Sequence, residues 1–309
     1  MPPFQSFFKY VRHLSVLVSL LAVVTVIGDC AMISPAGSAG GATTSPTVTT
    51  SGATMGSSTG TTTSTGAPPT PASAPPPSVH QVFQAKTLAS AQIGPVTATC
   101  PSGELALSGG WATSPSLGAY PVVFKSSRNG SAGWSIFVQY TGTTVVTAYA
   151  LCLKNAAGAT VTERAETGLV HAQSSGWQSA SCNRGENVVG GGFSGYTGMK
   201  LSDSHGSDDF INWAVYPTNG SLASQPFTVF AECLRYSGVS SSHSIGVQSS
   251  GHAISGECPG GGFLSGGGFM AAAYQPVAYI MRPTASGQKW EVFEVSGAGL
   301  TAQAICLTL

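Results

Sequence analysis

The chain has 309 residues, of which only 8% are charged, and its formal net charge is zero. Typical soluble domains carry roughly 25% charged residues. A chain this neutral lacks the clustered Lys and Arg that nucleic-acid binding requires and the basic surface that an anionic membrane attracts. We therefore expect no nucleic-acid partner, and membrane contact through the N-terminus only.

The first 30 residues have the pattern of an export signal. A basic stub precedes an almost wholly apolar run at 14–28, as in secretory signals. The run is shorter than the about 20 residues that a membrane span needs. The segment Ile27-Gly28-Asp29-Cys30 resembles a bacterial lipobox, with Asp29 where a small residue is usual. Three interpretations stay open: lipidation of Cys30, simple secretion, and an uncleaved anchor.

Residues 31–79 form the expected linker. From 31 to 77 the chain is rich in Gly, Ala, Ser, Thr and Pro and has no charged or aromatic residue. Such a segment cannot bury enough apolar surface to offset the entropy of ordering, so it predicts a disordered spacer. Its composition also fits an O-glycosylated stalk. The spacer would hold a folded domain, expected at 80–309, on the order of 40 Å from a surface.

Three copies of one unit make up the rest of the chain, at 91–154, 173–236 and 249–309. Each copy has a cysteine, a glycine pair with an aromatic residue after it, a tryptophan that opens an alternating strand, and a last strand with a second cysteine. The glycine steps are Gly109-Gly110-Trp111, Gly191-Gly192-Phe193 and Gly267-Gly268-Phe269. The tryptophans are Trp134, Trp213 and Trp290, which we expect in the core. Glycine at the step suits a bulge or a close backbone approach.

Six of the seven cysteines fall within these copies. An even set in an exported chain indicates disulfides, and six cysteines allow 15 connectivities. The paired cysteines of the three copies are 52, 51 and 48 residues apart. The repeat therefore selects Cys100–Cys152, Cys182–Cys233 and Cys258–Cys306, each joining the first strand of a unit to its last.

The expected fold is all-β, with about five short strands in each disulfide-bridged unit. Glycine is abundant, and helical patterns are scarce, which favours short strands joined by turns. Three such units close most simply around a pseudo-threefold axis, as in a β-prism. Three small sandwiches in tandem are the alternative, although the short links between units favour one body.

The repeated Cys-Pro-x-Gly, the glycine–aromatic step and the closing strand with a second cysteine resemble the threefold unit of the vitelline membrane outer layer protein I family. The Cys-Pro-x-Gly motif stands at Cys100 and Cys258. The pattern is also similar to modules of uncharacterised bacterial secreted proteins. The resemblance covers about residues 91–309 and implies a β-prism with a carbohydrate-related or matrix role. It assigns no functional residue in this chain.

Few side chains suggest chemistry. The glycine-rich string Gly190–Gly195 matches a dinucleotide fingerprint, but the repeat explains those glycines, so we expect no cofactor. Only unit two has the polar cluster Asp203, His205, Asp208 and Asp209, which could hold Ca²⁺ or a transition metal. A solvated turn is the other interpretation. No pair of acids recurs as glycoside hydrolysis would suggest, and we identify no catalytic residue.

Aromatic residues outside the repeated positions are the candidates for ligand binding. Tyr120, Tyr196 and Tyr274 each follow the glycine–aromatic step at different offsets and so lie in loops. Loops on a rigid scaffold often carry function. Trp177 has no counterpart in the other units and is a second candidate. Packing at the rim of the fold is the alternative for the tyrosines.

The sequence thus predicts an extracellular or cell-envelope protein that displays a binding or structural module, with a glycan or cell-wall polymer as its ligand. A secreted hydrolase or transferase acting on a polysaccharide is one alternative. A purely structural envelope or coat protein is another. The chain is more consistent with a protein that is not an enzyme, and its sequence does not give an oligomeric state.

Overall fold

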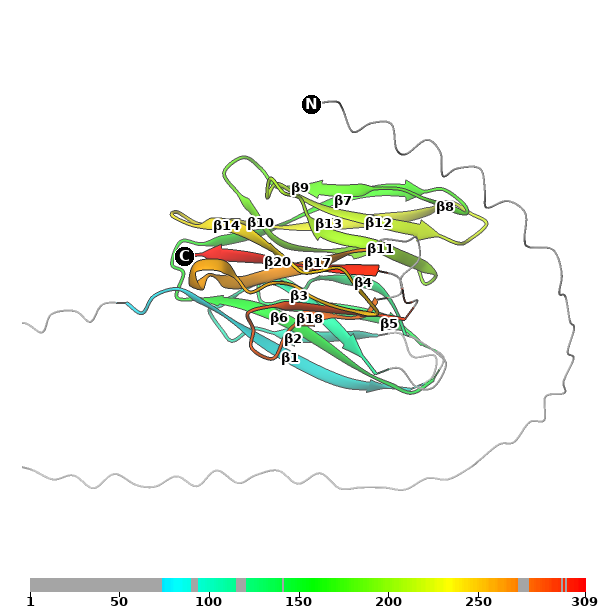
Figure 1. The fold of residues 1–309 in the computed structure, drawn as a ribbon, viewed down its shortest axis with the longest axis horizontal. Coiled ribbons are helices and arrows are strands. Elements are labelled where there is room, and N and C mark those ends of the chain that lie inside the picture. Colours follow the sequence, from blue (N-terminus) through cyan, green and yellow to red (C-terminus); the bar gives the residue numbers. More distant parts are fainter. Residues whose placement is uncertain are drawn as a thin grey trace, which may run out of the picture. The chain divides into compact units, whose positions relative to one another are not determined.

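A computed structural model describes residues 74–89, 94–114, 121–140, 142–271, 278–295, 297 and 299–309. Within these residues the fold is almost entirely β, as expected, with a single 3₁₀ turn at Pro259–Gly261 (Figure 1). All strand pairs are antiparallel, and they form three sheets. β1 begins at Ser78, so the folded domain starts two residues earlier than predicted.

The first sheet has the order β1-β6-β3-β18-β19-β16. Its strands are β1 (Ser78–Leu88), β6 (Thr144–Lys154), β3 (Leu105–Thr113), β18 (Ala278–Pro283), β19 (Trp290–Glu294) and β16 (His252–Ile254). The second sheet has the order β2-β5-β4-β10-β13-β7. Its strands are β2 (Pro95–Thr99), β5 (Gly133–Gln139), β4 (Val122–Arg128), β10 (Asn187–Ser194), β13 (Gln225–Arg235) and β7 (Thr160–Val170).

The third sheet has the order β14-β20-β17-β11-β12-β8, with β15 paired to β20 and β9 paired to β12. Its strands are β14 (Ser240–Ile245), β20 (Gly299–Thr308), β17 (Phe263–Ala271), β11 (Met199–Gly206), β12 (Asn212–Asn219), β8 (Ser174–Ser175), β15 (Ser249–Ser250) and β9 (Gln178–Ser181). Each sheet therefore contains six main strands that come from two different units.

The sharing of sheets is cyclic. Unit one places β1, β3 and β6 in the first sheet and β2, β4 and β5 in the second, and the other two units divide in the same way. Every unit thus pairs with both of the others, which confirms the pseudo-threefold arrangement and excludes three separate sandwiches. Each unit has six main strand positions instead of five, because β1, β7 and β14 precede the predicted repeat boundaries.

The three predicted disulfides are present, joining Cys100 to Cys152, Cys182 to Cys233 and Cys258 to Cys306. Cys100 follows β2, and Cys152 lies in β6. The bridge therefore connects the second main strand of the unit, not the first, to its last strand. Cys182 after β9 and Cys258 after β16 repeat this arrangement. Because the two strands that each bridge connects belong to different sheets, each bridge fastens one sheet to the next.

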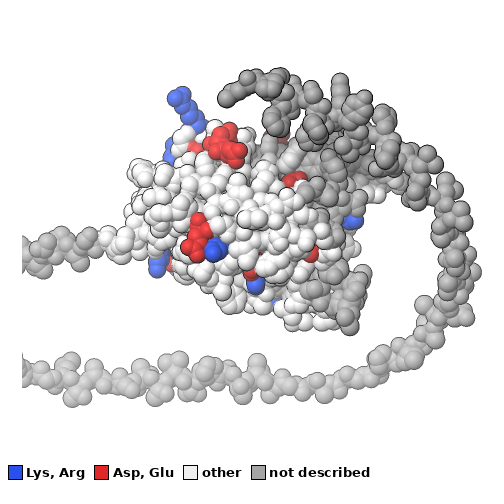
Figure 2. Space-filling view, viewed as in Figure 1, with Lys and Arg blue, Asp and Glu red and all other residues white. Residues whose placement is uncertain are grey.

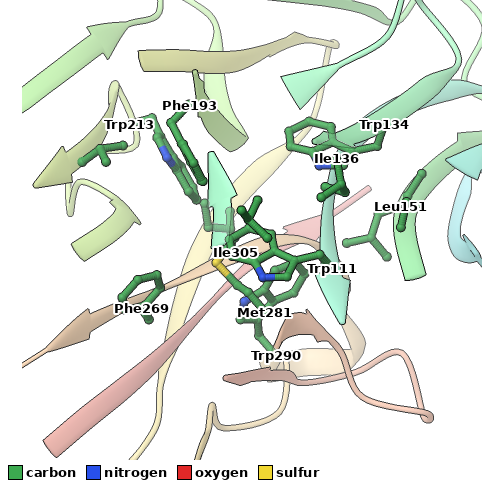
Figure 3. Packing of buried hydrophobic residues seen from close by; sticks show 14 of the residues in the cluster. Trp111, Trp134, Ile136, Leu151, Phe193, Trp213, Phe269, Met281, Trp290 and Ile305 are labelled. Carbon is green, nitrogen blue, oxygen red and sulfur yellow. The ribbon is translucent and has the colours of Figure 1, made fainter. Parts of the chain in front are cut away.

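The core lies between the three sheets, and the repeated aromatic residues fill it (Figure 3). Trp134, Trp213 and Trp290 are fully buried, as predicted, and the aromatic of each glycine step is buried as well. A Cβ at Gly109, Gly191 or Gly267 would come closer than 3.0 Å to the tryptophan ring of its own unit. Any larger residue at these three positions would clash with the ring, so the packing of the tryptophans requires glycine there.

The second glycine of each step lies at the seam between two units. A Cβ at Gly110, Gly192 or Gly268 would come closer than 3.0 Å to a backbone oxygen of the neighbouring unit. Each seam is short, with two paired residues from each strand, such as Phe193 with Ser126 on β10 and β4. Because these glycines let the two backbones approach closely, two residue pairs are enough to join neighbouring units at each seam.

Candidate functional site

Of the predicted ligand-binding residues, the structure describes Tyr196 and Trp177. Tyr120, Tyr274 and Cys30 lie outside the described residues. Tyr196 is half-buried and packs against the hydrophobic core, and its hydroxyl donates a hydrogen bond to Asn219 Oδ1 at 3.2 Å. This contact ties the segment after β10 to the end of β12, which is the rim-packing role given as the alternative for this tyrosine.

Trp177 lies between β8 and β9 on the outside of the third sheet, and 57% of its surface is exposed. The other four tryptophans of the chain are buried. The Trp177 ring makes edge contacts with two side chains, Tyr216 on β12 at 5.1 Å and His205 on β11 at 5.7 Å between ring centroids. A large aromatic side chain that is held by its neighbours and exposed to solvent can serve as a binding platform.

A shallow groove of about 130 Å³ lies beside this tryptophan. It is bounded by the end of β7, by β8 and by the start of β9, and these strands lie together at the top of the view in Figure 1. The side chains along it include Leu169, His171, Ser174, Ser175, Trp177 and Gln178. The groove thus combines apolar surface with hydroxyl and amide groups that can donate and accept hydrogen bonds.

The four predicted metal ligands divide into two pairs. Asp203 and His205 are alternate residues of β11 and so lie on the same face, beside Tyr216 and Trp177. Asp208 and Asp209 lie in the turn after that strand. Asp209 accepts hydrogen bonds from the Ser207 hydroxyl and the Ile211 backbone N–H, and Asp208 lies 3.8 Å from His243 Nδ1.

These four side chains do not converge on one point. Within the described part of the chain, one group of acids, histidines and cysteines brings three donor atoms within 4.8 Å of one another, and it consists of His80, Glu104 and Cys152. Cys152 is in a disulfide, so its sulfur is not a thiolate ligand. The arrangement at Asp203 and His205 is better suited to hydrogen bonding and charge recognition than to holding a metal.

An outward aromatic position that was not predicted from the sequence recurs in all three sheets. Phe137, Tyr216 and Phe293 each stand three residues after the core tryptophan of their unit. An odd spacing along a strand places the two side chains on opposite faces, so these rings point outward when the tryptophans point inward. The spacing is visible in the sequence, but its meaning depends on which face is buried.

The three outward aromatics have different neighbours. Lys125 Nζ lies 5.2 Å from the centroid of the Phe137 ring in the second sheet. His252 stacks on Phe293 in the first sheet, with 3.7 Å between ring centroids. At Tyr216 in the third sheet the neighbour is instead the exposed indole of Trp177. Unit two is therefore the unit that combines the outward aromatic with an exposed tryptophan and a groove.

Electrostatics single out Asp203. Burial raises the pKa of this carboxyl, whereas the Ala271 backbone N–H and the nearby His205 act in the opposite direction. Ala271 N–H donates to Asp203 Oδ1 at 3.0 Å. Most of the surface in Figure 2 is uncharged, and the acidic and basic residues form small separate groups. Asp203 is thus a half-buried carboxylate beside Tyr216, the ring that the exposed Trp177 indole contacts.

Comparisons with known proteins do not assign the chain to a family. No model of a known protein family matches it, and no curated protein matches its sequence significantly. The three disulfides in a small all-β domain are consistent with an extracellular location. Within the described ranges no helix is long and apolar enough to cross a bilayer.

Proposed function

We propose that the domain is a surface-displayed, non-enzymatic binding module for a glycan or cell-wall polymer, with Trp177 as its binding platform. The observation that carries the proposal is the exposed indole of Trp177, supported from the side by Tyr216 and His205. An aromatic ring can stack on the apolar face of a sugar, since it offers a flat, apolar surface at low entropic cost.

The groove beside Trp177 supports a ligand that is both apolar and rich in hydroxyls. Leu169 offers exposed apolar surface, and Ser174 and Gln178 supply polar groups on the same side. Few groups in the groove carry charge, which favours recognition through stacking and hydrogen bonds. The groove is shallow, as suits a polymer that lies across the surface and leaves most of its length outside the protein.

The proposal includes display outside the cell. The apolar N-terminal run would direct export, and the linker at 31–77 would then separate the domain from the surface that holds it. Lipidation of Cys30 would attach the chain to a membrane by its N-terminus alone. Disulfides that join the sheets suit a domain that works in an oxidising environment.

Binding of the full chain to an array of glycans and cell-wall polysaccharides tests this function. The variant Trp177→Ala should lose about thirty-fold in affinity for any polymer that the wild type binds, because truncating a central aromatic platform costs about 2 kcal/mol. Phe83→Ala is the matched control, since Phe83 is 65% exposed on β1 of the first sheet. It should bind like the wild type.

Two outcomes would contradict the proposal. If the wild type binds no polymer, a purely structural role takes precedence. If Trp177→Ala and Phe83→Ala bind as well as the wild type, the protein binds glycans at some other place than the groove.

A further inference from the structure

The second sheet shows how this fold uses its outward aromatic position. Lys125 on β4 is the cross-strand partner of Phe137 on β5. Its ammonium group lies 5.2 Å from the centre of the Phe137 ring, within the range of a cation–π interaction. The domain thus holds one of its own amines over this ring.

The same position in the third sheet carries the opposite charge. The partner of Tyr216 on β12 is Asp203 on β11. The correspondence is fixed by the seams, because Lys125 pairs with Ser194 of the next unit and Asp203 pairs with Met270 of the next unit. A carboxylate therefore replaces the lysine beside an aromatic ring of the same orientation.

In the second sheet the ring beside Phe137 is Phe124, at 6.2 Å between ring centroids. The third sheet instead places the exposed indole of Trp177 and the imidazole of His205 near its outward aromatic, Tyr216. The rings of Trp177 and Tyr216 meet at 67°, and those of Trp177 and His205 meet at 82°. Rings at steep angles form a corner, and the faces of aromatic rings attract cations. More than half of the Trp177 surface is exposed, so one wall of this corner is accessible to a ligand from solvent.

The hairpin of β11 and β12, which contains Asp203, has an excess of negative charge. The segment 199–219 contains three acids, Asp203, Asp208 and Asp209, and a single lysine, Lys200. Asp203 also keeps acceptor capacity in addition to its bond from the Ala271 N–H, because each ionised carboxylate can accept several hydrogen bonds. An ammonium group placed here would gain a charged acceptor and an aromatic corner together.

We propose that the Trp177 groove binds a protonated amine, and that its ligand is a polysaccharide of amino sugars whose amino groups are free. The ammonium group of the ligand occupies the corner of Trp177 and Tyr216 and donates to Asp203, where the second sheet holds the amine of Lys125. The inference rests on the proposed glycan-binding function and narrows it from sugars in general to cationic amino sugars.

Calorimetric titration of the full chain with two hexasaccharides tests this inference. One is a glucosamine hexamer with free amino groups, and the other is the same hexamer fully N-acetylated. The free-amine hexamer should bind roughly tenfold more tightly than the acetylated one. This is the gain in affinity expected from a partly exposed cation–π interaction together with a charge contact. Its affinity should fall with added salt, as expected for a charge contact near the surface.

The variant Asp203→Asn isolates the charge. The amide keeps an oxygen that can accept from Ala271 N–H, so the β11–β17 seam is preserved. This variant should bind the two hexamers within about twofold of each other. Glu257→Gln is the matched control, because it removes one exposed negative charge in unit three and should leave the preference for the free amine intact.

Each outcome assigns the site differently. If both hexamers bind equally to the wild type, or the acetylated one binds more tightly, the amine inference is wrong and the glycan function stands. If the Trp177→Ala chain binds either hexamer as well as the wild type, this groove is not the site. If neither hexamer binds but choline does, the site recognises an ammonium group from a source other than a sugar. If neither hexamer nor choline binds, the amine inference fails, and the polysaccharide array alone decides whether the glycan-binding function stands.

Discussion

Single glycines decide whether neighbouring units can meet. A Cβ at Gly192 would come closer than 3.0 Å to the Ser126 oxygen at the seam between units one and two. We predict that Gly192→Ala lowers the free energy of unfolding by about 3 kcal/mol or more, because overpacking against backbone atoms forces the strands apart. Urea unfolding measures the change. Gly220→Ala is the control, since nothing lies within 4 Å of a Cβ there; an equal loss in both variants would contradict the seam explanation.

Glu232 is a charged residue at a position that is apolar in the other units. It is fully buried and pairs across strands with Gly190, as Leu151 pairs with Ser108 and Ile305 with Gly266. Arg128 Nη1 approaches its Oε2 at 3.2 Å. Burial raises the pKa of Glu232 to about 8 although Arg128 acts in the opposite direction.

This residue makes stability depend on pH. Between its ordinary pKa of 4.5 and about 8 the folded chain binds a proton that the unfolded chain releases. Its contribution to stability is therefore complete below 4.5 and is lost as the pH rises through 8. We predict that the melting temperature falls more steeply from pH 5 to pH 8 in the wild type than in Glu232→Gln. Parallel profiles would show that Glu232 is ionised in the folded chain throughout this range.

At the scale of elements, the sequence predicted the parts that repeat. The glycine step and the core tryptophans could be identified because the same residue types fill the equivalent packed positions in all three units. β1, β7 and β14 could not be identified as members of the unit. They are edge strands with many exposed residues and no shared pattern. An edge strand pairs with a neighbour on one side only, and this restricts its residue types too weakly to produce a repeated sequence pattern.

The candidate site was predicted in part. The sequence singled out Trp177 for ligand binding and both Asp203 and His205 for metal binding, and the structure brings all three to one face of the third sheet. Their proximity depends on β9 and β11 both flanking β12, a strand order that no local pattern specifies. Tyr216 was missed because it looked like another member of a repeated strand.

The disulfides act between elements that belong to different sheets. Removing the unit-two bridge with Cys182→Ser and Cys233→Ser opens a loop of 51 residues. The chain-entropy relation gives a loss of about 4 kcal/mol for a loop of this size. Chemical unfolding of the double variant under oxidising conditions measures it. An unchanged midpoint would mean that the sheets hold together without this bridge.

At the scale of the whole molecule, cyclic sharing of sheets makes the three units interdependent. No unit has a complete sheet of its own, because half of every sheet comes from a neighbour. We predict one cooperative unfolding transition in calorimetry, with equal calorimetric and van't Hoff enthalpies. Two or three resolved transitions would indicate units that fold independently, as tandem sandwiches would. The sequence could not decide this point, because each seam involves only two residue pairs per unit boundary.

The proposed function places the bound sugar polymer on the Trp177 indole, and tryptophan fluorescence reports on that contact. Trp177 is the exposed member of the chain's five tryptophans, and the other four are at most 1% exposed. Iodide should quench the emission of the wild type and have little effect on Trp177→Phe. We predict that saturating glucosamine hexamer protects the wild type from this quenching. Quenching that persists at ligand concentrations where calorimetry shows full binding would contradict the claim.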